Sequence, residues 1–364
     1  MFQYDIVNRI AVGMSGGVDS SVAAALLVKD GQDCVGMTMK LWNHKSSRCE
    51  DKGNLCCSLE SVEAARRVAR KLEIDYFVIN VEEKFKKEVV DDFVDAYARG
   101  VTPNPCVICN EKIKFAHFDE KASLLNADLI ATGHYARTCE DPSGRVLLLK
   151  GKDKWKDQSY MLYRLSQDQL RRAIFPLGNL TKDEVRGLAH DFSLDVADKP
   201  DSQEVCFVPY DDYRVFITEY RPELGVNGDI TDEYGNVLGR HNGIAMYTIG
   251  QRKGLGSLGE RPMYVVDILP DENRVVAGYV ESTYSNTFYA KNLNFMPFDE
   301  LNQSITVEVK VRYRSSPQKA TIIPIENDVI KVELAEPCSA VTPGQSVVFY
   351  DGEIVVGGGI IFKN

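Results

Sequence analysis

A chain of 364 residues, 44% of them hydrophobic, is long enough for two or three domains that each bury an apolar core. No stretch approaches the ~18 apolar residues of a membrane span, and the first ten residues lack the basic and apolar regions of a secretion signal. The formal net charge of -10 argues against a nucleic-acid partner unless basic residues gather locally. We therefore expect a soluble, cytoplasmic protein without a membrane partner.

Strand-like and helix-like stretches alternate from residue 5 to about residue 205. The expected elements are a strand at 9–14, a helix closed by Gly31, a strand at 33–42, a helix at 58–73, a strand at 75–81, a helix ending near Gly100 and a strand at 127–136. A capping box, Thr181 with Glu184, opens a further helix. This alternation predicts an α/β domain with a doubly wound parallel sheet, which binds ligands at the carboxyl ends of its strands.

The stretch GMSGGVDSS at 13–21 lies where the first strand meets the first helix. Its glycines allow a sharp turn whose backbone N–H groups point at an anion, and its serines add hydroxyl donors near the positive end of the helix. Asp19 would repel a phosphate unless a divalent cation lay between them, so it indicates magnesium. The loop lacks the lysine of G-x-x-x-x-G-K-[ST]. The alternative is an ordinary glycine-rich turn.

Nine cysteines in a chain without an export signal favour thiol or metal chemistry over a disulfide framework. Cys106 and Cys109 form a C-x-x-C pair after two prolines at the expected start of a helix, where thiolates are stabilised. The pair could be a nucleophile, a metal ligand or structural, and no second pair completes a zinc site cleanly. Taken alone, Cys206 is more typical of a buried small residue. The same interpretation applies to Cys34, Cys139 and Cys338, and no role is assigned to Cys49, Cys56 and Cys57.

After about residue 208, Gly, Asn and Asp turns separate short strand candidates, which predicts a small separate domain. The last 80 or so residues are rich in strand signals. The segment 305–314 alternates strictly, with Ile305, Val307, Val309, Val311 and Tyr313 on a core face and Thr306, Glu308, Lys310, Arg312 and Arg314 opposite. A two-residue hairpin at 349–355 completes the prediction of a small barrel. The basic runs 145–156 and 310–319 could hold a phosphate backbone or simply be solvated.

Nine motifs in order resemble the tRNA-specific 2-thiouridylase family, whose ATP site belongs to the pyrophosphate-loop ATP pyrophosphatase superfamily. They are GMSGGVDSS, GMTMKLW, TPNPCVICNEKIKF, ATGHYAR, KDQSYML, DSQEVCF, YTIGQRKGLG, VRYR and TPGQSVVFY. The resemblance spans nearly the whole chain. It implies an ATP-binding domain of the adenine nucleotide alpha hydrolase type at 1–208, a small mixed domain at 209–284 and a tRNA-contacting C-terminal β-barrel at 285–364.

The resemblance also implies roles for particular residues. ATP would be bound by Gly13, Met14, Ser15, Gly16, Gly17, Val18, Asp19, Ser20, Met39 and Gly133. Cys109 would be the nucleophile and Cys206 the carrier of a persulfide, while Asn104, Pro105 and Cys106 would lie against the target base. The tRNA would be contacted by His134, Lys156, Asp157, Gln158, Arg312, Tyr313 and Gln345.

The implied reaction adenylates the C2 oxygen of the wobble uridine with ATP and Mg²⁺ and then transfers sulfur, giving 2-thiouridine, AMP and pyrophosphate. The family often has aspartate where this chain has Cys106, so an acid or base role for that carboxylate does not transfer. Cys106, Cys109 and Cys206 could instead hold an iron–sulfur cluster. The sulfur donor would be a cysteine desulfurase or a relay protein, and we expect a monomer. One alternative is another AMP-forming enzyme, a ligase or an amidating enzyme, that uses the same loop. The other is an iron–sulfur or RNA-binding protein in which the loop at 13–21 has no catalytic role.

Overall fold

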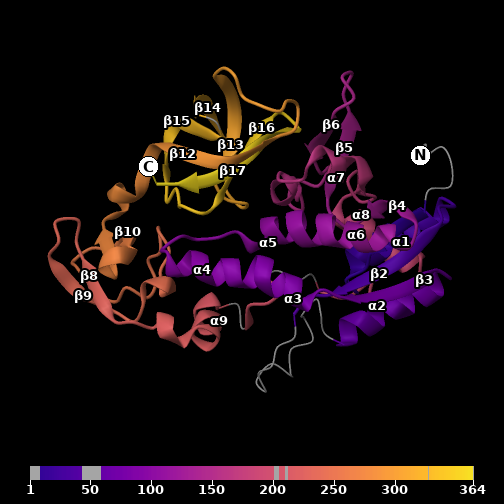
Figure 1. The fold of residues 1–364 in the computed structure, drawn as a ribbon, viewed down its shortest axis with the longest axis horizontal. Coiled ribbons are helices and arrows are strands. Elements are labelled where there is room, and N and C mark those ends of the chain that lie inside the picture. Colours follow the sequence, from indigo (N-terminus) through magenta and orange to yellow (C-terminus); the bar gives the residue numbers. More distant parts are fainter. Residues whose placement is uncertain (1–8, 43–58, 201–204, 210–211, 327, 364) are drawn as a thin grey trace. The chain divides into compact units, whose positions relative to one another are not determined.

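The computed structural model describes residues 9–42, 59–200, 205–209, 212–326 and 328–363 (Figure 1). The chain divides into two compact units. Unit 1 comprises Met1–Val89, Cys106–Phe207 and Glu353–Val355, and unit 2 comprises Val90–Pro105, Val208–Gly352 and Val356–Asn364. Each unit is thus assembled from segments that lie far apart in the sequence. No helix in the described part of the chain combines the length and apolar character needed to cross a membrane.

The central sheet of unit 1 is parallel throughout, with strands in the order β3-β2-β1-β4-β7. Its strands are β1 (Arg9–Gly13), β2 (Cys34–Lys40), β3 (Asp75–Asn80), β4 (Ala127–Ala131) and β7 (Ala173–Ile174). The chain steps from β1 outward through β2 to β3 and then places β4 on the other side of β1. Ligands bind parallel sheets where the strand order reverses, which here is at the carboxyl ends of β1 and β4.

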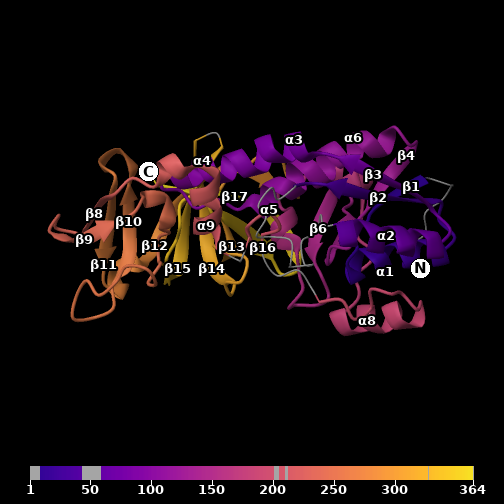
Figure 2. The same cartoon turned by 90° about the horizontal axis from the view of Figure 1, so that it is seen from below.

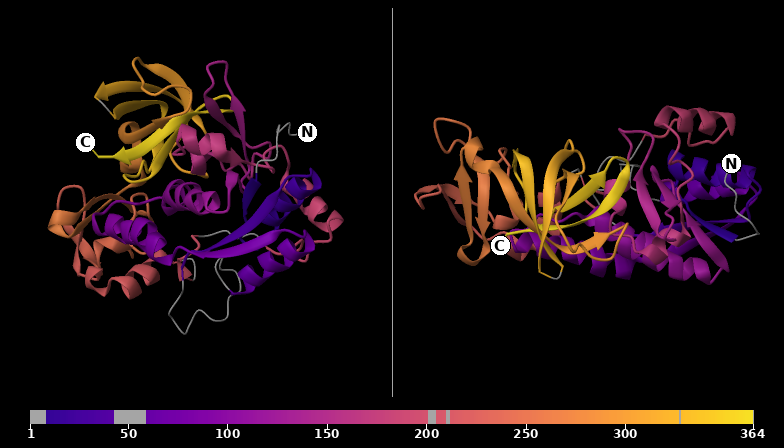
Figure 3. Two further views of the ribbon diagram at one scale, coloured as in Figure 1. Left: turned by 45° about the vertical axis from the view of Figure 1, so that its right-hand side comes forward. Right: turned by 90° about the horizontal axis from the view of Figure 1, so that it is seen from above.

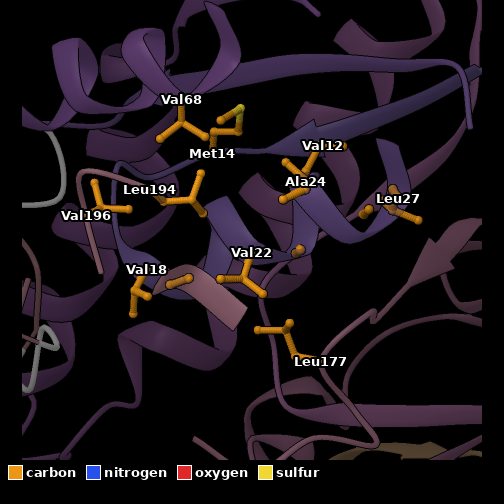
Figure 4. Close-up of a cluster of buried hydrophobic side chains, with 14 of the residues drawn as sticks. Val12, Met14, Val18, Val22, Ala24, Leu27, Val68, Leu177, Leu194 and Val196 are labelled. Atoms are coloured by element: carbon orange, nitrogen blue, oxygen red, sulfur yellow. The ribbon is translucent and has the colours of Figure 1, made fainter. Parts of the chain in front are cut away.

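Helices cover both faces of this sheet, as expected for a doubly wound domain. Successive residues of a strand point to opposite faces, so Ile10 and Val12 join the apolar cluster around α1 (Val18–Lys29), whereas Ala11 joins the cluster with Phe118. The first cluster also takes side chains from α2 (Leu59–Lys71) and α8 (Lys182–Asp191). Figure 4 shows part of it, with Val12 beside Ala24.

α1 is buried on most of its surface, and the run Ala23, Ala24 and Ala25 allows neighbouring elements to approach it closely. It ends before Gly31, whose φ of 77° is the left-handed conformation that glycine adopts without strain. The predicted helix and its stop signal are both confirmed. The capping box of Thr181 and Glu184 at the start of α8 is confirmed as well.

A second long helical segment runs without a break from Pro105 to Ser123. It consists of α5 (Pro105–Ile108), the π-helix η2 (Cys109–His117) and α6 (Phe118–Ser123). π-helical turns are rare and occur often at functional sites. Unit 1 also contains a hairpin of β5 (Ala136–Glu140) and β6 (Val146–Lys150). The short helices η3 (Ser159–Leu162) and α7 (Gln167–Arg172) follow this hairpin.

Unit 2 contains a four-stranded sheet in the order β10-β11-β8-β9 (Figure 2). Its strands are β8 (Gly228–Thr231), β9 (Val237–His241), β10 (Tyr264–Leu269) and β11 (Arg274–Gly278). The helices α4 (Asp92–Ala98) and α9 (Tyr213–Tyr220) meet through the stacked rings of Tyr97 and Tyr213, 4.5 Å apart. The α4 segment therefore packs with residues that follow it by more than 100 positions.

The C-terminal strands form a closed six-stranded barrel, in the order β12-β15-β14-β13-β16-β17 with β17 paired back to β12 (Figure 3). They are β12 (Tyr284–Phe295), β13 (Ile305–Lys310), β14 (Gln318–Glu326), β15 (Val329–Ser339), β16 (Ser346–Asp351) and β17 (Ile354–Phe362). The barrel and its final two-residue hairpin confirm the prediction. Closure leaves no free sheet edge in the barrel.

The alternating strand predicted at 305–314 is shorter than expected. Val307 and Val309 are buried in the barrel core as predicted, but β13 ends at Lys310. The backbone then turns, with the N–H of Ser315 donating to the carbonyl of Arg312. The alternation of apolar and polar residues in the sequence runs on to Arg314, but the strand needs a pairing partner, and β14 pairs with β13 only as far as Val309.

Candidate active site

The loop between β1 and α1 requires glycine at position 16. Gly16 has a φ of 74°, and a Cβ atom there would lie 2.1 Å from the carbonyl oxygen of Ser61. The serine hydroxyls hold the loop in shape: Ser20 accepts from the backbone N–H of Ser15 at 3.1 Å, and Ser21 donates to the carbonyl of Gly17 at 2.8 Å. The loop is therefore held at the start of α1 by its own side chains, and its role as a phosphate cradle stays a prediction.

Lys182 supplies a positive charge that the loop itself lacks. Its ammonium donates to Oδ1 of Asp19 at 2.7 Å, and the hydroxyl of Tyr135 donates to the same oxygen at 2.8 Å. Lys182 is only 8% exposed and is the first residue of α8, where its backbone N–H donates to Asp153. The ammonium compensates the carboxylate, so Asp19 by itself no longer requires magnesium.

Lys199 is a second cation at this loop. Its ammonium donates to the carbonyl of Gly16 at 3.2 Å and to the hydroxyl of the buried Ser61 at 3.4 Å. Sequence reasoning missed both lysines because they follow the loop by more than 160 residues and neither lies in a phosphate-binding pattern. The only local signal was the capping box, which located the start of α8 without indicating where Lys182 points.

The segment after β4 forms the other side of the cradle. A Cβ atom at Gly133 would lie 2.7 Å from the backbone nitrogen of Ser20, so this glycine packs directly on the first turn of α1. Met39 lies in β2 and packs against the cluster on the opposite face from α1. The side chain of Met14 is buried in the core, and its backbone N–H donates to the carbonyl of Met37 at 2.8 Å, so the expected contact of Met14 with ATP stays a prediction.

Cys109 begins the π-helix of the 105–123 segment and is 6% exposed. Cys106, one turn earlier in α5, is half-buried. Asn110, the residue after Cys109, donates to the carbonyl of Met161 at 2.9 Å, and Glu111 binds Arg164 through two hydrogen bonds of 2.6 and 3.1 Å. The helix that carries the proposed nucleophile is thus fixed to the residues around η3.

Cys206 lies in a turn and is half-buried. Its neighbour Phe207 is buried and packs edge-on against Phe85, with ring centroids 5.7 Å apart. Cys106, Cys109 and Cys206 all belong to unit 1. In the described ranges, however, no three His, Cys, Asp or Glu side chains gather closely enough to hold a metal ion.

The remaining cysteines differ from the uniform interpretation made from sequence. Cys34 is buried, and burial raises the pKa of its thiol to about 12, with a further contribution from Asp33. That thiol is inert near neutral pH. Cys139 is exposed at the end of β5, so the expectation of burial is wrong there, and Cys338 is half-buried. Cys49, Cys56 and Cys57 lie outside the described residues.

His134 is buried among aromatic rings rather than exposed to RNA. It is 8% exposed, its Nδ1 is 2.8 Å from the hydroxyl of Thr132, and the rings of Phe115 and Phe175 lie beside it. Burial, with a contribution from Lys114, holds the pKa of His134 well below 6.5. The imidazole is therefore neutral, and a contact with tRNA would require local rearrangement.

The other residues expected to contact tRNA lie in well-defined turns. Lys156, Asp157 and Gln158 are half-buried in the loop after β6, where Gln158 accepts from the backbone of Tyr135 at 3.0 Å. Arg312 is exposed in the turn after β13. Tyr313, also in that turn, lies under the ammonium of Lys310, 5.6 Å from its ring centroid.

Gln345 holds the segment that leads to the proposed nucleophile. Its amide donates to the carbonyls of Thr102 and Pro103 at 3.1 and 3.0 Å. The N–H of Thr102 donates in turn to the carbonyl of Pro343 at 2.9 Å. Within unit 2, Asn104 and Pro105 therefore continue directly from a backbone segment anchored by the loop at 342–345.

The size of a hollow does not identify the site. A hollow of about 500 Å³ lies on the four-stranded sheet of unit 2, lined by residues that include Asp232, Glu233, Asp267 and Arg274. It is lined by none of the residues expected to bind ATP, the target base or tRNA. The loop at 13–20 is instead characterised by its backbone turn and the two lysine ammonium groups bonded to it.

Three family models match successive parts of the chain. They are the tRNA methyl transferase HUP domain at residues 8–210, the tRNA methyl transferase PRC-barrel domain at 214–279 and the aminomethyltransferase beta-barrel domain at 285–361. Among solved structures, a complex of a 4-thiouridine synthetase with RNA and bound ATP is 18% identical, covers 59% of this chain and 51% of that chain, and has a TM-score of 0.35. A structural similarity this low supports no argument about the site.

Curated relatives match over nearly the whole length. The tRNA-specific 2-thiouridylase MnmA 1 of Caldanaerobacter subterraneus subsp. tengcongensis is 49% identical over 360 residues, covering 99% of both chains. The tRNA-specific 2-thiouridylase MnmA of Clostridium perfringens is 48% identical over 354 residues, covering 97% of this chain and 98% of that protein. That of Carboxydothermus hydrogenoformans is 48% identical over 362 residues, covering 99% of both.

Proposed function

The chain belongs to the tRNA-specific 2-thiouridylase family, and we propose that its glycine loop and two of its cysteines carry out the reaction in two stages. In the first stage, the C2 oxygen of the wobble uridine attacks the α-phosphate of ATP, which releases pyrophosphate and leaves an O-adenylate. In the second stage, a sulfur nucleophile attacks C2 and AMP departs. The protein is a tRNA-uridine 2-sulfurtransferase that forms AMP.

Adenylation is needed because oxide is a poor leaving group from the amide-like C2 carbon. The cradle at residues 13–20 binds the departing pyrophosphate through backbone N–H groups at the start of α1. Lys182 and Lys199 bring two positive charges to that loop. They stabilise the negative charge that accumulates as pyrophosphate leaves.

Sulfur transfer uses a persulfide on Cys206. Its terminal sulfur attacks C2 and displaces AMP, and the Cys109 thiolate then attacks the Cys206 sulfur, which breaks the S–S bond and leaves sulfur on C2. Alternatively, Cys109 attacks first and releases hydrosulfide, which then displaces AMP. Both routes end in a Cys109–Cys206 disulfide that an external thiol must reduce. Because Cys109 is buried in this structure, a local movement must expose it.

One observation supports this assignment above the others: the glycine cradle, Cys109 and Cys206 belong to the same compact unit. The two cysteines are 97 positions apart in the sequence, yet both are held by packed neighbours, Cys109 through its anchored helix and Cys206 through Phe207. A unit that contains the nucleotide cradle and both thiols is what an adenylation followed by sulfur transfer requires.

The described side chains do not form a metal site of their own. Asp19 is already paired with Lys182, and no group of three ligating side chains exists among the described residues. We therefore propose that Mg²⁺ enters with the phosphate oxygens of ATP. An iron–sulfur cluster held by Cys106, Cys109 and Cys206 does not fit this arrangement, because these three described side chains do not gather closely enough to ligate it.

The proposed partners follow from the chemistry. The substrate is the anticodon loop of a tRNA, whose uridine must leave its stack to be modified. The sulfur comes from a protein that carries a persulfide, such as a cysteine desulfurase or a relay protein. We also propose that the enzyme acts as a monomer in the cytoplasm.

The test is mass spectrometry of nucleosides from a tRNA transcript incubated with the protein, ATP and a persulfide donor. Wild-type protein should give 2-thiouridine together with AMP and pyrophosphate. Cys109→Ser and Cys206→Ser should abolish 2-thiouridine while leaving ATP binding intact. The matched control is Cys139→Ser, because Cys139 is an exposed cysteine of the same unit and should be dispensable.

Two outcomes would contradict the proposal. Product formation by both cysteine variants would favour an amidating or ligating enzyme that uses the same loop. Pyrophosphate release that does not depend on tRNA would remove the proposed acceptor. A loss of product in Cys106→Ser, accompanied by loss of an absorbance near ~400 nm after anaerobic purification, would instead support the iron–sulfur alternative.

A further inference from the structure

Trp155 is the most exposed large hydrophobic side chain among the described residues, at 94%. It lies in the loop between β6 and η3. An indole ring offers a large flat apolar face, and tryptophan on average buries much of it. A ring left in solvent on a tightly held loop is therefore available to stack on a flat partner.

The exposure of Trp155 does not come from a loose backbone. Asp153 accepts from the N–H groups of Trp155 and Lys156 at 2.9 and 3.2 Å. Asp157 accepts from the N–H groups of Gly151 and Ser159 at 2.9 and 3.1 Å. Both sides of the turn are fixed by carboxylates, so the indole is presented at a defined position.

The same loop is fastened to the nucleotide cradle. The second oxygen of Asp153 accepts from the backbone N–H of Lys182, whose ammonium donates to Asp19. Gln158, at the other end of the loop, accepts from the backbone of Tyr135, and the hydroxyl of Tyr135 also donates to Asp19. Two separate chains of hydrogen bonds thus connect the Trp155 loop to one carboxylate of the glycine loop.

Lysines lie on both sides of the indole, although the whole chain carries -10 and the carboxylates of Asp153 and Asp157 in the same loop accept hydrogen bonds from its backbone. Lys154 and Lys156 flank Trp155, and Lys152 lies two positions before Lys154. Lys152 forms an ion pair with Glu184 at 3.2 Å, so part of its charge is compensated. An aromatic ring between cations is the arrangement by which proteins bind single-stranded nucleic acid, stacking on the base and attracting the backbone.

We propose that Trp155 stacks on an unpaired nucleobase of the bound tRNA and so helps to hold the substrate beside the ATP site. This inference rests on the proposed function. Stacking on an indole face depends little on which base is present. Trp155 therefore contributes affinity for tRNA and leaves the choice of tRNA to other contacts.

The experiment measures binding of an unmodified tRNA transcript to the full-length protein. Trp155→Ala should raise the Kd for tRNA by roughly tenfold, and Trp155→Phe, which keeps an aromatic face, should raise it less. The matched control is Tyr234→Ala, because Tyr234 is 92% exposed but lies in the turn between β8 and β9 of unit 2. That control should bind tRNA as the wild type does, and all variants should bind ATP equally.

A second readout follows the ring itself. The chain has two tryptophans, so in Trp42→Phe all indole emission comes from Trp155. Adding tRNA should quench that emission, because a nucleobase stacked on the indole takes up an electron from its excited state. The inference is overturned if the emission does not change and Trp155→Ala binds tRNA within twofold of the wild type, an outcome that leaves the ring to a protein partner. Failure of the wild type to make 2-thiouridine would instead overturn the proposed function.

Discussion

The ion pair of Lys182 with the half-buried Asp19 explains how a loop without a lysine can bind a polyphosphate. A phosphate-binding loop without a lysine, but with an aspartate, looks electrostatically unfavourable for a polyphosphate. The 2.7 Å contact removes that difficulty, because the ammonium neutralises the carboxylate within a partly buried site. The cation is thus supplied by tertiary structure in place of the loop itself.

We predict that Lys182→Met weakens ATP binding by about tenfold or more, since Asp19 would then stand as an uncompensated charge beside the phosphates. Calorimetric titration with ATP measures this. The double variant Asp19→Asn with Lys182→Met should recover part of the affinity. Lys152→Met, which removes an exposed lysine of the neighbouring loop, is the control and should change ATP affinity little. Equal affinities in wild type and Lys182→Met would contradict the argument.

The buried imidazole of His134 predicts a dependence of stability on pH. Its pKa lies well below 6.5 in the folded chain because of burial, so below pH 6.5 the unfolded chain binds more protons. The stability that this group contributes is present above pH 6.5 and is lost as the pH falls. In His134→Phe, the slope of unfolding free energy between pH 6.5 and 5 should decrease by up to about 1.4 kcal/mol per pH unit.

Urea denaturation at a series of pH values tests this prediction. The control is His190→Gln, because His190 is an exposed histidine of the same unit and should leave the slope almost unchanged. His241 also has a lowered pKa because of burial, so part of the slope should remain in every variant. An unchanged slope in His134→Phe would mean that the imidazole is not held neutral.

Helix α1 approaches the segment after β4 so closely that position 133 has no room for a side chain. Gly133 touches the first turn of α1 so closely that a Cβ atom would lie 2.7 Å from the Ser20 nitrogen and 2.8 Å from the Asp19 carbonyl carbon. Both neighbours are backbone atoms and cannot rotate away. The glycine is therefore needed to keep the cradle against β4.

Gly133→Ala should accordingly lower the free energy of unfolding by about 1–3 kcal/mol, since the added methyl group overpacks a backbone contact. ATP affinity should fall with it. The matched control is Gly187→Ala in α8, where an added Cβ meets nothing within 4 Å. That variant should gain about 0.5–1 kcal/mol because alanine favours a helix interior. Chemical denaturation compares the two, and a neutral Gly133→Ala would contradict the close contact.

Across unit 2, one side chain joins regions that are 243 residues apart in the sequence. The Gln345 amide binds the carbonyls of Thr102 and Pro103, which precede the residues expected to face the target base. In this structure that amide nitrogen is occupied by protein. The expected contact of Gln345 with tRNA remains a prediction, and it would have to use the other amide atom or replace these two hydrogen bonds.

Gln345→Ala should increase amide hydrogen exchange at residues 101–104 and reduce the rate of thiolation, with ATP affinity unchanged. Loss of the two hydrogen bonds should cost about 1–2 kcal/mol of stability in unit 2. Gln303→Ala, at an exposed position of the same unit, is the control. Unaltered exchange at 101–104 would show that this segment is held by other contacts.

Local sequence determined much of this protein. The alternation of strands and helices, the stop at Gly31, the capping box at Thr181 and the barrel hairpin at Gly352 each depend on residues close together in the chain. The nine ordered motifs identified the family for the same reason, since each motif is a short continuous stretch. Such features are readable because hydrogen bonding and backbone preference act over a few residues.

Tertiary structure alone decided how the site is charged and held. The lysines at 182 and 199, the burial of His134 and the Gln345 anchor all depend on contacts between residues 19 to 243 positions apart. Strand β13 is shorter than its sequence pattern because its pairing with β14 stops at Val309. Electrostatic compensation and burial arise from distance in space, and that distance is fixed only when the whole chain has packed.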